Sequence, residues 1–167
     1  ISTRAEPAGF QTADSVSAGD EQGEKDHKVH GDQTKTQPPN GQTFRVADTN
    51  GWFSWELKAL PDVAQELDVE FGGERRRRPD AVDIFANETK LATVRLSGGA
   101  RAEYYPLTNA ALKGKDAITV KFQAAAGSRV DGIANVSIMK IPLPTIASAS
   151  KASSTRTNWQ FIVNAVN

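Results

Sequence analysis

Cysteine is absent from the 167-residue chain. This absence excludes disulfide scaffolds, thiol nucleophiles and thiolate zinc sites. The chain also has no net charge, with 20 basic and 20 acidic residues, so no overall field favours nucleic acid or an anionic membrane. No apolar run approaches the roughly 18 residues of a membrane-spanning helix. We therefore expect neither a nucleic-acid nor a membrane partner.

Motifs for catalysis are missing as well. The sequence has no Ser/His/Asp constellation in a recognisable turn context and no glycine-rich loop that would cradle phosphate. The glycine pairs at 72–73 and 98–99 indicate turns. Carboxylates are plentiful, but the sequence does not show whether two of them stand at the separation that glycoside hydrolysis needs. We expect a chain without catalytic residues of its own.

The length suits one domain with a real hydrophobic core. We expect residues 1–13 to be a linker or lead-in, 14–141 a single domain, and 142–167 a Pro/Ser/Ala-rich linker and tail. Because the chain begins with Ile, we interpret it as a piece of a longer protein. Residues 1–42 are polar and keep no period for long, which predicts mostly loop.

Apolar residues alternate with polar ones in several short segments after residue 42, and this period of two predicts β-strands with one buried face. Closely spaced turn signals between these segments favour an all-β fold, an antiparallel β-sandwich of the jelly-roll type. One short helical turn is expected in PLTNAALKG, capped by Thr108 or Asn109 and ended by Gly114. The predicted core residues are Leu67, Val69, Phe71, Val82, Ile84, Val94, Leu96, Ile118, Val120, Phe122, Val136 and Ile138.

Aromatic residues provide the clearest binding signal, in the segment GWFSWEL. Alternation along a strand predicts Phe53, Trp55 and Leu57 inside and leaves Trp52 at the rim. An exposed ring there would be a stacking platform for the C–H face of a sugar, whereas a buried ring would only cap the core. Tyr104 is a second candidate, because one ring of the Tyr-Tyr pair should point outward.

The polar segment 19–34 holds the only two histidines, His27 and His30, and leaves three interpretations open. Their spacing suits a metal only if the segment is helical, and Gly31 and the lack of apolar periodicity argue against a helix. Glu24 and His27 could instead hydrogen-bond loop backbone and hold the segment over the sheet, the interpretation we favour. They could also contact sugar hydroxyls.

Four consecutive arginines, residues 75–78, form the strongest charge run. Such a run could grip phosphate or an acidic polysaccharide. A strand or loop would point the side chains to alternate sides, and Glu74, Asp80 and Asp83 nearby can neutralise them. A solvated loop with one arginine drawn into an ion pair is therefore the default interpretation.

Four segments between Asp14 and Lys140, in this order, carry a resemblance: VSAGDEQGEKDHKVHGDQT, FRVADTNGWFSWELK, DVEFGGERRRRPDAVDIFANETKLATVRL and LKGKDAITVKFQAAAGSRVDGIANVSIMK. Together they resemble the C-terminal β-sandwich domain of bacterial β-L-arabinofuranosidase-type glycoside hydrolases, glycoside hydrolase family 127 and relatives. In that family the chemistry belongs to a separate helical barrel with a cysteine nucleophile, so the resemblance implies a non-catalytic accessory domain.

Two function classes follow from this resemblance. The first is a carbohydrate-binding or substrate-positioning module of an enzyme that degrades plant polysaccharide, with an arabinose-containing polysaccharide as the expected ligand. The second is a purely structural domain that packs against the catalytic domain of the parent enzyme. Both imply a bacterial protein, secreted or periplasmic. The expected carbohydrate-binding residues are Trp52, Glu24, His27, Tyr104 and Arg75.

A structural calcium ion is a further expectation. β-Sandwiches of the carbohydrate-binding type often hold one where the first and last strands meet, and Asp20, Glu21 and Asp131 lie near those two ends of the domain in sequence. Calcium takes six to eight oxygen ligands, so backbone carbonyls and water would have to complete the set.

Overall fold

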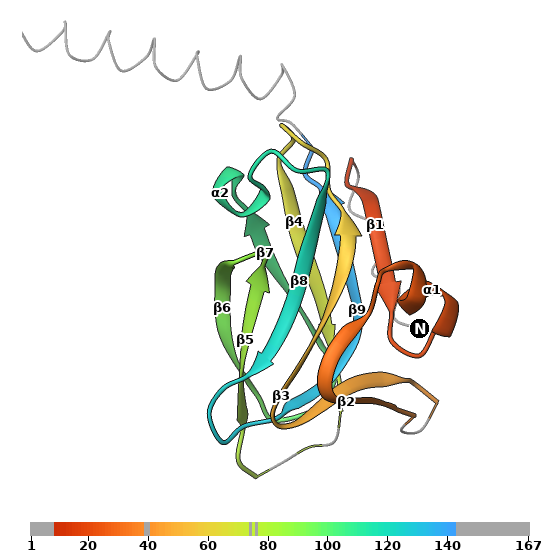
Figure 1. Ribbon diagram of the computed structural model, residues 1–167, viewed down its shortest axis with the longest axis vertical. Coiled ribbons are helices and arrows are strands. Elements are labelled where there is room, and N and C mark those ends of the chain that lie inside the picture. Colours follow the sequence, from red (N-terminus) through yellow and green to blue (C-terminus); the bar gives the residue numbers. More distant parts are fainter. Residues whose placement is uncertain (1–8, 39–40, 74, 76, 143–167) are drawn as a thin grey trace, which may run out of the picture.

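The computed structural model describes residues 9–38, 41–73, 75 and 77–142 (Figure 1). This part of the chain forms nine strands and two short helices, which confirms the all-β prediction. No helix in these residues is long and apolar enough to cross a membrane. The elements are β1 (Gln11–Ser17), α1 (Glu21–Asp26), β2 (His30–Gln37), β3 (Phe44–Lys58), β4 (Gln65–Phe71), β5 (Asp80–Ala86), β6 (Thr89–Leu96), β7 (Arg101–Leu107), α2 (Asn109–Leu112), β8 (Ala117–Ala124) and β9 (Val130–Lys140).

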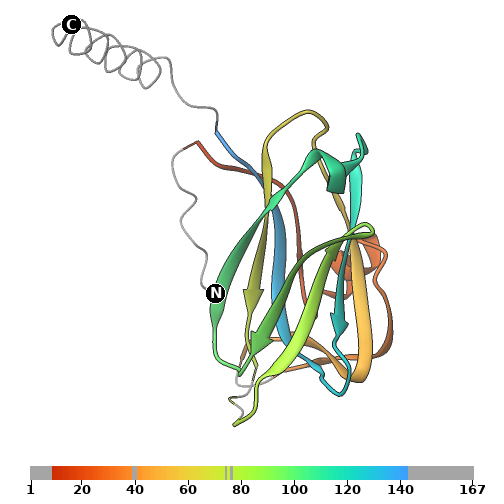
Figure 2. The ribbon, with the colours of Figure 1, turned by 90° about the vertical axis from the view of Figure 1, so that its left-hand side faces the viewer.

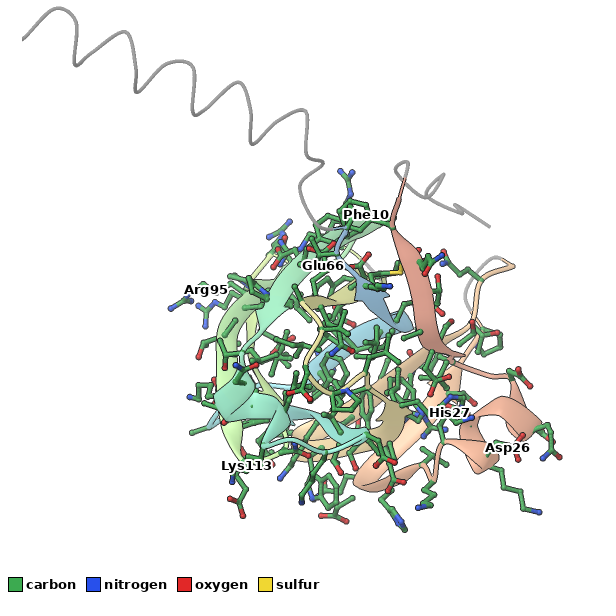
Figure 3. All side chains as sticks on the ribbon, turned by 90° about the horizontal axis from the view of Figure 1, so that it is seen from above. Phe10, Asp26, His27, Glu66, Arg95 and Lys113 are labelled. Carbon is green, nitrogen blue, oxygen red and sulfur yellow. The ribbon has the colours of Figure 1, made fainter. Side chains whose placement is uncertain are left out.

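All strand pairs are antiparallel, and they form a sandwich of two layers. The strand order is β6-β5-β8-β3-β9-β4-β7, with β1 added beside β9 and β2 beside β3. Figure 2 shows β7, β4 and β9 toward one side and β8 and β3 toward the other. Seen from above in Figure 3, side chains fill the space between the layers, and Arg95 of β6 and His27 after α1 lie at opposite edges.

Strand β3 joins the two layers because it is long and irregular in its middle. Its first part pairs with β9, with Arg45 opposite Ile133, and its second part pairs with β8, with Phe53 opposite Phe122. Gly51 lies at the irregularity, where a Cβ atom would stand 2.9 Å from the backbone carbonyl oxygens of Asp32 in β2 and of Asp48 in β3 itself. Only glycine allows this close approach.

The core lies between the layers, and all twelve predicted core residues are buried there. Phe53, Trp55 and Leu57 are fully buried, as the alternation predicts. The rings of Phe53 and Trp55 lie 5.2 Å apart, and the ring of Phe122 lies 5.4 Å from the first and 6.1 Å from the second. Burying each such side chain stabilises the fold by about 1.5–3 kcal/mol.

The expectation of mostly loop over residues 1–42 is wrong for the described part, which contains β1, α1 and β2. Both strands lie at sheet edges, where most of their side chains are exposed and need not be apolar. The helix is also contrary to expectation. It forms because Asp20 caps it, with its carboxylate accepting from the N–H of Gly23 at 3.1 Å.

The short helix α2 confirms the other helical prediction. The hydroxyl of Thr108 accepts a hydrogen bond from the N–H of Ala111, so Thr108 is the cap. The helix ends at Lys113, which takes the left-handed conformation one residue before the expected Gly114. Most of the predicted lead-in, residues 1–13, and nearly all of the predicted tail, residues 142–167, lie outside the described residues.

Candidate functional site

The outward surface of strands β3, β8, β5 and β6 carries the best-developed group of aromatic and polar side chains, and we name it the Trp52 face. Its residues alternate along each strand with buried core residues, so they point away from the core. Sequence reasoning identified only the first of them. The residues are Trp52, Asp83, Phe85, Lys90, Thr93, Lys121 and Gln123.

Two aromatic rings lie on the Trp52 face. Trp52, which is half-buried, stands opposite Gln123, and Gln123 stands opposite Asp83. Phe85, also half-buried, is two residues further along the same strand as Asp83. With strands about 4.8 Å apart and a rise of about 3.4 Å per residue, the two aromatic positions are separated by about 12 Å. A ligand that reaches both must be an extended molecule of several units.

A lysine lies over each ring. The Nζ atom of Lys121 is 4.5 Å from the centre of the Trp52 ring, and that of Lys90 is 5.8 Å from the centre of the Phe85 ring. Each contact contributes about 0.5–1 kcal/mol at an exposed position. A sugar that stacks on the side of the Trp52 ring that Lys121 covers must therefore displace Lys121.

Hydrogen-bonding groups lie between the two rings. The Asp83 carboxylate accepts a hydrogen bond from the Thr93 hydroxyl at 2.5 Å and pairs with the Lys90 ammonium at 3.1 Å. These two neighbours hold the pKa of Asp83 below its ordinary value. The side-chain amide of Gln123 donates to the backbone oxygen of Asn50 at 3.3 Å. The face thus offers an anion, cations and an amide within reach of the rings.

Glu24 does not belong to the Trp52 face. It is buried, with 4% of the residue exposed, and its two carboxylate oxygens accept from Nε and Nη2 of Arg45 at 2.6 and 2.8 Å. The Arg45 guanidinium lies 6.0 Å from the centre of the Phe53 ring. Because Phe53 and Trp52 point to opposite sides of β3, this ion pair lies on the other side of the strand.

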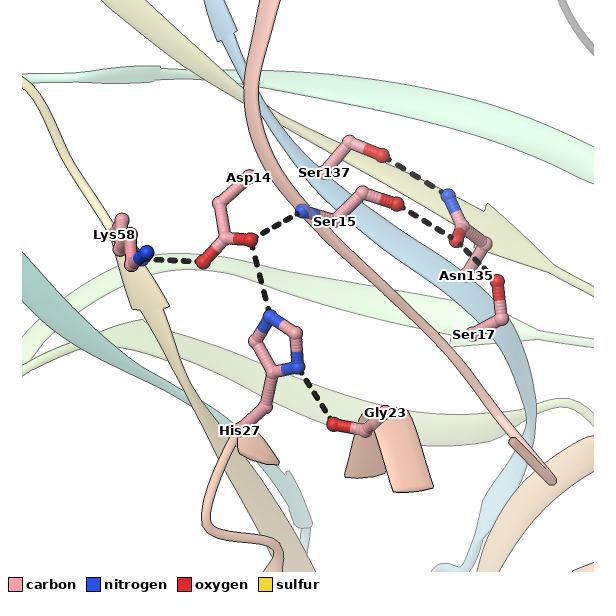
Figure 4. Close-up of polar contacts among 8 residues, drawn as sticks. All are labelled: Asp14, Ser15, Ser17, Gly23, His27, Lys58, Asn135 and Ser137. Atoms are coloured by element: carbon pink, nitrogen blue, oxygen red, sulfur yellow. Dashed lines mark hydrogen bonds and ion pairs between the residues drawn. The ribbon is translucent and has the colours of Figure 1, made fainter. Parts of the chain in front are cut away.

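His27 is also held away from the Trp52 face, between α1, β1 and β3 (Figure 4). Its Nδ1 donates to the Gly23 carbonyl at 2.6 Å, and its Nε2 donates to Asp14 at 3.1 Å. The other oxygen of Asp14 accepts from the backbone N–H of Lys58 at 2.7 Å. With both ring nitrogens donating, the imidazole is protonated and has no lone pair for a metal. This arrangement agrees with the structural interpretation of segment 19–34.

The environment shifts the pKa values of both partners in this pair. Burial alone would lower the pKa of His27, but the hydrogen bonds to Asp14 and to the Gly23 carbonyl outweigh it and raise the pKa. Burial alone would raise the pKa of Asp14, but the Lys58 N–H and His27 outweigh it and lower the pKa. Both shifts widen the pH range over which the pair is ionised, toward higher pH for His27 and toward lower pH for Asp14.

Tyr104 lies on the outer face of the opposite layer. It stands across from Asp68 of β4 and is 40% exposed, whereas Tyr105 stands across from the buried Leu67 and packs against the core. One ring of the pair therefore points out and the other in, as predicted. Trp52 and Tyr104 belong to different layers, so the structure does not bring these two candidate residues together.

The described residues of the arginine run lie near two different segments of the chain. Arg75 is exposed, and its Nε lies 3.8 Å from where a Cβ atom would stand on Gly99. Arg77 and Arg78 line a shallow depression of about 500 Å³ together with residues of the loop between β8 and β9, among them Arg129. The sequence identified the run but not this third arginine, which lies more than fifty positions later.

The expected calcium ligands do not fit a metal site. Asp20 accepts the N–H of Gly23 as a helix cap, Glu21 is exposed in the first turn of α1, and Asp131 is buried in β9 with 5% of the residue exposed. Among the described residues, no three or more His, Asp or Glu side chains are grouped closely enough to hold a metal ion. The calcium expectation is therefore not supported by these residues.

Sequence reasoning missed most of the Trp52 face. Phe85 could have been flagged, because it is aromatic at the outward phase of AVDIFA. Lys121 and Gln123 occupy the outward phase of their own segment. Nothing in the sequence shows that these three lie beside Trp52, since that depends on which strands pair.

Comparison with known proteins places the chain in a family. A family model described as a family of unknown function, DUF6805, matches residues 9–139, most of the chain. No curated protein matches the sequence at a significant level.

Several solved structures share the fold. One is a carbohydrate-binding module from lichenase 5A of Cellvibrio mixtus in complex with cellotriose, with a TM-score of 0.52, 10% identity and coverage of 78% of this chain and 99% of that one. A family 36 module in complex with calcium and xylotriose has a TM-score of 0.54, 9% identity and coverage of 74% and 98%. A family 36 module of a xylanase from the hindgut metagenome of Trinervitermes trinervoides has a TM-score of 0.54, 11% identity and coverage of 80% and 99%. At these identities the likeness shows the β-sandwich fold of carbohydrate-binding modules.

Proposed function

The chain belongs to the DUF6805 family, whose function is unknown, and from that premise we propose that it is a non-catalytic module that binds carbohydrate through the Trp52 face. Trp52 carries the proposal: its half-buried ring lies on the outward side of a sheet, beside side chains that can exchange hydrogen bonds with hydroxyls. Sugars combine weakly polarised C–H faces, which stack on aromatic rings, with hydroxyls that need donors and acceptors.

The fold supports the same ligand class. The modules from Cellvibrio mixtus and from family 36 are described in complex with cellotriose and xylotriose, two short linear oligosaccharides. An extended chain of this kind also suits the separation of about 12 Å between Trp52 and Phe85, estimated from strand geometry. We assign no sugar from these relatives, because the likeness concerns the fold.

The wider setting of the module is part of the proposal. Its resemblance to the C-terminal domain of β-L-arabinofuranosidase-type enzymes supports a parent glycoside hydrolase that degrades plant polysaccharide, with an arabinose-containing ligand. The same resemblance supports a bacterial protein, secreted or periplasmic. The module would hold the polysaccharide near the catalytic domain and would contribute no catalytic residue.

Binding through this face should be weak. The face is open and solvated, and Lys121 must leave the Trp52 ring before a sugar can stack there. One stacked ring and a few exchanged hydrogen bonds can supply about 4 kcal/mol, which corresponds to a dissociation constant near 1 mM.

Affinity electrophoresis of the whole chain through gels that contain single polysaccharides tests the proposal. Arabinan, arabinoxylan, xylan and cellulose derivatives form the panel. We expect retardation by at least one of them, and we expect Trp52→Ala to remove it while the free energy of unfolding falls by no more than about 2 kcal/mol, because the ring is only half-buried. Tyr104→Ala is the matched control, since it removes an exposed ring from the other layer.

The control separates the two candidate faces. Retardation that survives Trp52→Ala but disappears with Tyr104→Ala would move the binding site to the outer face of β4 and β7. A chain that no polysaccharide retards would instead support the alternative, a purely structural domain packed against the catalytic barrel. The exposed Tyr104 ring and Leu60, which is 38% exposed, favour that alternative as candidate contact residues.

A further inference from the structure

The depression beside the arginine run is strongly basic. Arg77 and Arg78 approach it from the loop before β5, and Arg129 lines it from the loop between β8 and β9. Among the described residues that line it, Asp80 is the only acidic one. These residues bring three guanidinium groups and one carboxylate to an open depression of about 500 Å³, in a chain whose net charge is zero.

Asp80 is already paired with Arg129, at one side of this depression. Its Oδ1 accepts the backbone N–H of Arg129 at 3.1 Å, and its Oδ2 lies 4.0 Å from Nε of the same residue. In the described part of the chain, no carboxylate lies within ion-pair distance of Arg77 or Arg78, and both are exposed. These two guanidinium groups are therefore available to an anion from outside.

The depression lies at the end of the sandwich nearest to Trp52. The backbone N–H of Asn50 donates to the Ser128 carbonyl at 3.0 Å, and the Asn50 side chain accepts from the N–H of Gly127 at 3.0 Å. Asn50 precedes Trp52 by two residues, and both of its partners line the depression. Asp80 likewise begins the strand that carries Asp83 and Phe85. A chain on the Trp52 face can therefore continue into the depression.

We infer that the depression binds the carboxylate of a uronic acid residue, so that the ligand of this module is an acidic polysaccharide. The inference rests on the proposed function, because it extends the ligand of the Trp52 face. Guanidinium groups match a planar carboxylate with two parallel N–H donors, and they stay charged at every physiological pH. The neutral sugars beside the uronic acid stack on Trp52, while Arg77 and Arg78 select for the charged unit.

Affinity electrophoresis at low ionic strength tests this inference with two acidic probes, polygalacturonate and glucuronoxylan. Each is paired with its carboxyl-reduced form, which keeps the backbone but replaces every carboxylate by a hydroxymethyl group. We expect at least one acidic form to bind about tenfold more tightly than its reduced partner, the sum of two exposed ion pairs. Salt should weaken this preference, because ions screen exposed charges over a Debye length that shortens to about 10 Å at 0.1 M.

Variants test which residues cause the tighter binding of the acidic form. We expect Arg77→Ala/Arg78→Ala to weaken binding of the acidic form about tenfold and to leave the reduced form unaffected. Replacing both residues by Lys keeps the charge but removes the parallel N–H donors of the guanidinium groups, and it should restore only part of the preference for the acidic form. Lys25→Ala/Lys115→Ala is the matched control, since it removes two exposed charges from α1 and from the loop after α2. All variants are first shown to melt as the unaltered chain does.

The outcomes separate this inference from the proposed function. Equal binding of the acidic and reduced forms overturns the inference, and so does an arginine variant that behaves like the lysine control. In either case, loss of binding in Trp52→Ala still upholds the carbohydrate-binding function. Dextran sulfate is the test for unspecific anion binding: if it binds more tightly than both uronates through Arg77 and Arg78, the assignment to a carboxylate is wrong.

Discussion

The buried ion pair between Glu24 and Arg45 allows a sharp test of how the N-terminal segment is attached to the sandwich. The side chains are only 5% and 11% exposed, and two charge-assisted hydrogen bonds join them. The third donor group of Arg45, Nη1, donates to the hydroxyl of Thr34 at 3.2 Å. The pair thus connects α1, β2 and β3 in one network.

Removing one partner should leave the other charge buried and unpaired. We expect Glu24→Leu to lower the free energy of unfolding by about 3–5 kcal/mol, and Arg45→Met to lower it by a similar amount. For a domain of this size, each kcal/mol corresponds to roughly 2–6 °C, so the melting temperature should fall by about 10–20 °C. The double variant replaces both charges by apolar groups and should recover to within about 1 kcal/mol of the unaltered chain or exceed it.

Urea unfolding followed by tryptophan fluorescence, to which the fully buried Trp55 contributes, measures all four members of this cycle. A loss below about 1 kcal/mol in both single variants would show that the pair behaves like an exposed salt bridge, contrary to its burial. Glycan binding of the folded double variant should equal that of the unaltered chain, because Glu24 lies on the opposite side of β3 from Trp52. Lost binding would restore Glu24 as a ligand-contacting residue.

Three further predictions concern the core, the His27 pair and the Trp52 ring. Phe122→Ala removes a fully buried ring and should lower the free energy of unfolding by about 3–5 kcal/mol; an unchanged midpoint in thermal unfolding would show that β8 does not contribute that ring to the core. The raised pKa of His27 adds stability that is fully present below its ordinary pKa of 6.5 and is lost as pH rises through the higher pKa of the folded state. The lowered pKa of Asp14 adds stability that is lost as pH falls below its ordinary pKa of 3.8. The stability difference between the unaltered chain and His27→Gln should therefore be largest between pH 3.8 and 6.5 and should shrink as pH rises through the folded pKa of His27. A difference that grows as pH rises above 6.5 would contradict the ion pair. Lys121→Ala frees the outer face of Trp52 and should tighten glycan binding about two- to fivefold, the equivalent of one exposed cation–π contact, whereas lost binding would mean that Lys121 is a required donor.

The sequence by itself predicted the fold class and the core. In QELDVEF, AVDIFA and AITVKFQA the apolar residues recur at every second position, and a strand with that period can bury only one of its faces. The same period placed Phe53, Trp55 and Leu57 inside and left Trp52 outside. These are local properties, because successive side chains of a strand alternate whatever the strand pairs with.

The N-terminal strands escaped prediction for a related physical reason. An edge strand such as HGDQTKTQ, whose side chains are almost all exposed, needs no apolar face, and its partner strand β3 satisfies its backbone groups. Glu24 and His27 were recognised as polar anchors of this segment, but their partners Arg45 and Asp14 were not. Glu24 and Arg45 are 21 positions apart and His27 and Asp14 are 13 apart, and no local sequence pattern links residues at such separations.

Only the tertiary structure decided what surrounds Trp52. Strand order places Gln123 and Lys121 of β8 beside it, Phe85 of β5 beyond them, and the loop of Arg129 at the nearby end of the sandwich. The same order puts Tyr104, the second aromatic candidate from the sequence, on the other layer. Strand order is chosen by the packing of the whole core and not by any one segment, because each strand presents the same backbone donors and acceptors to every possible neighbour.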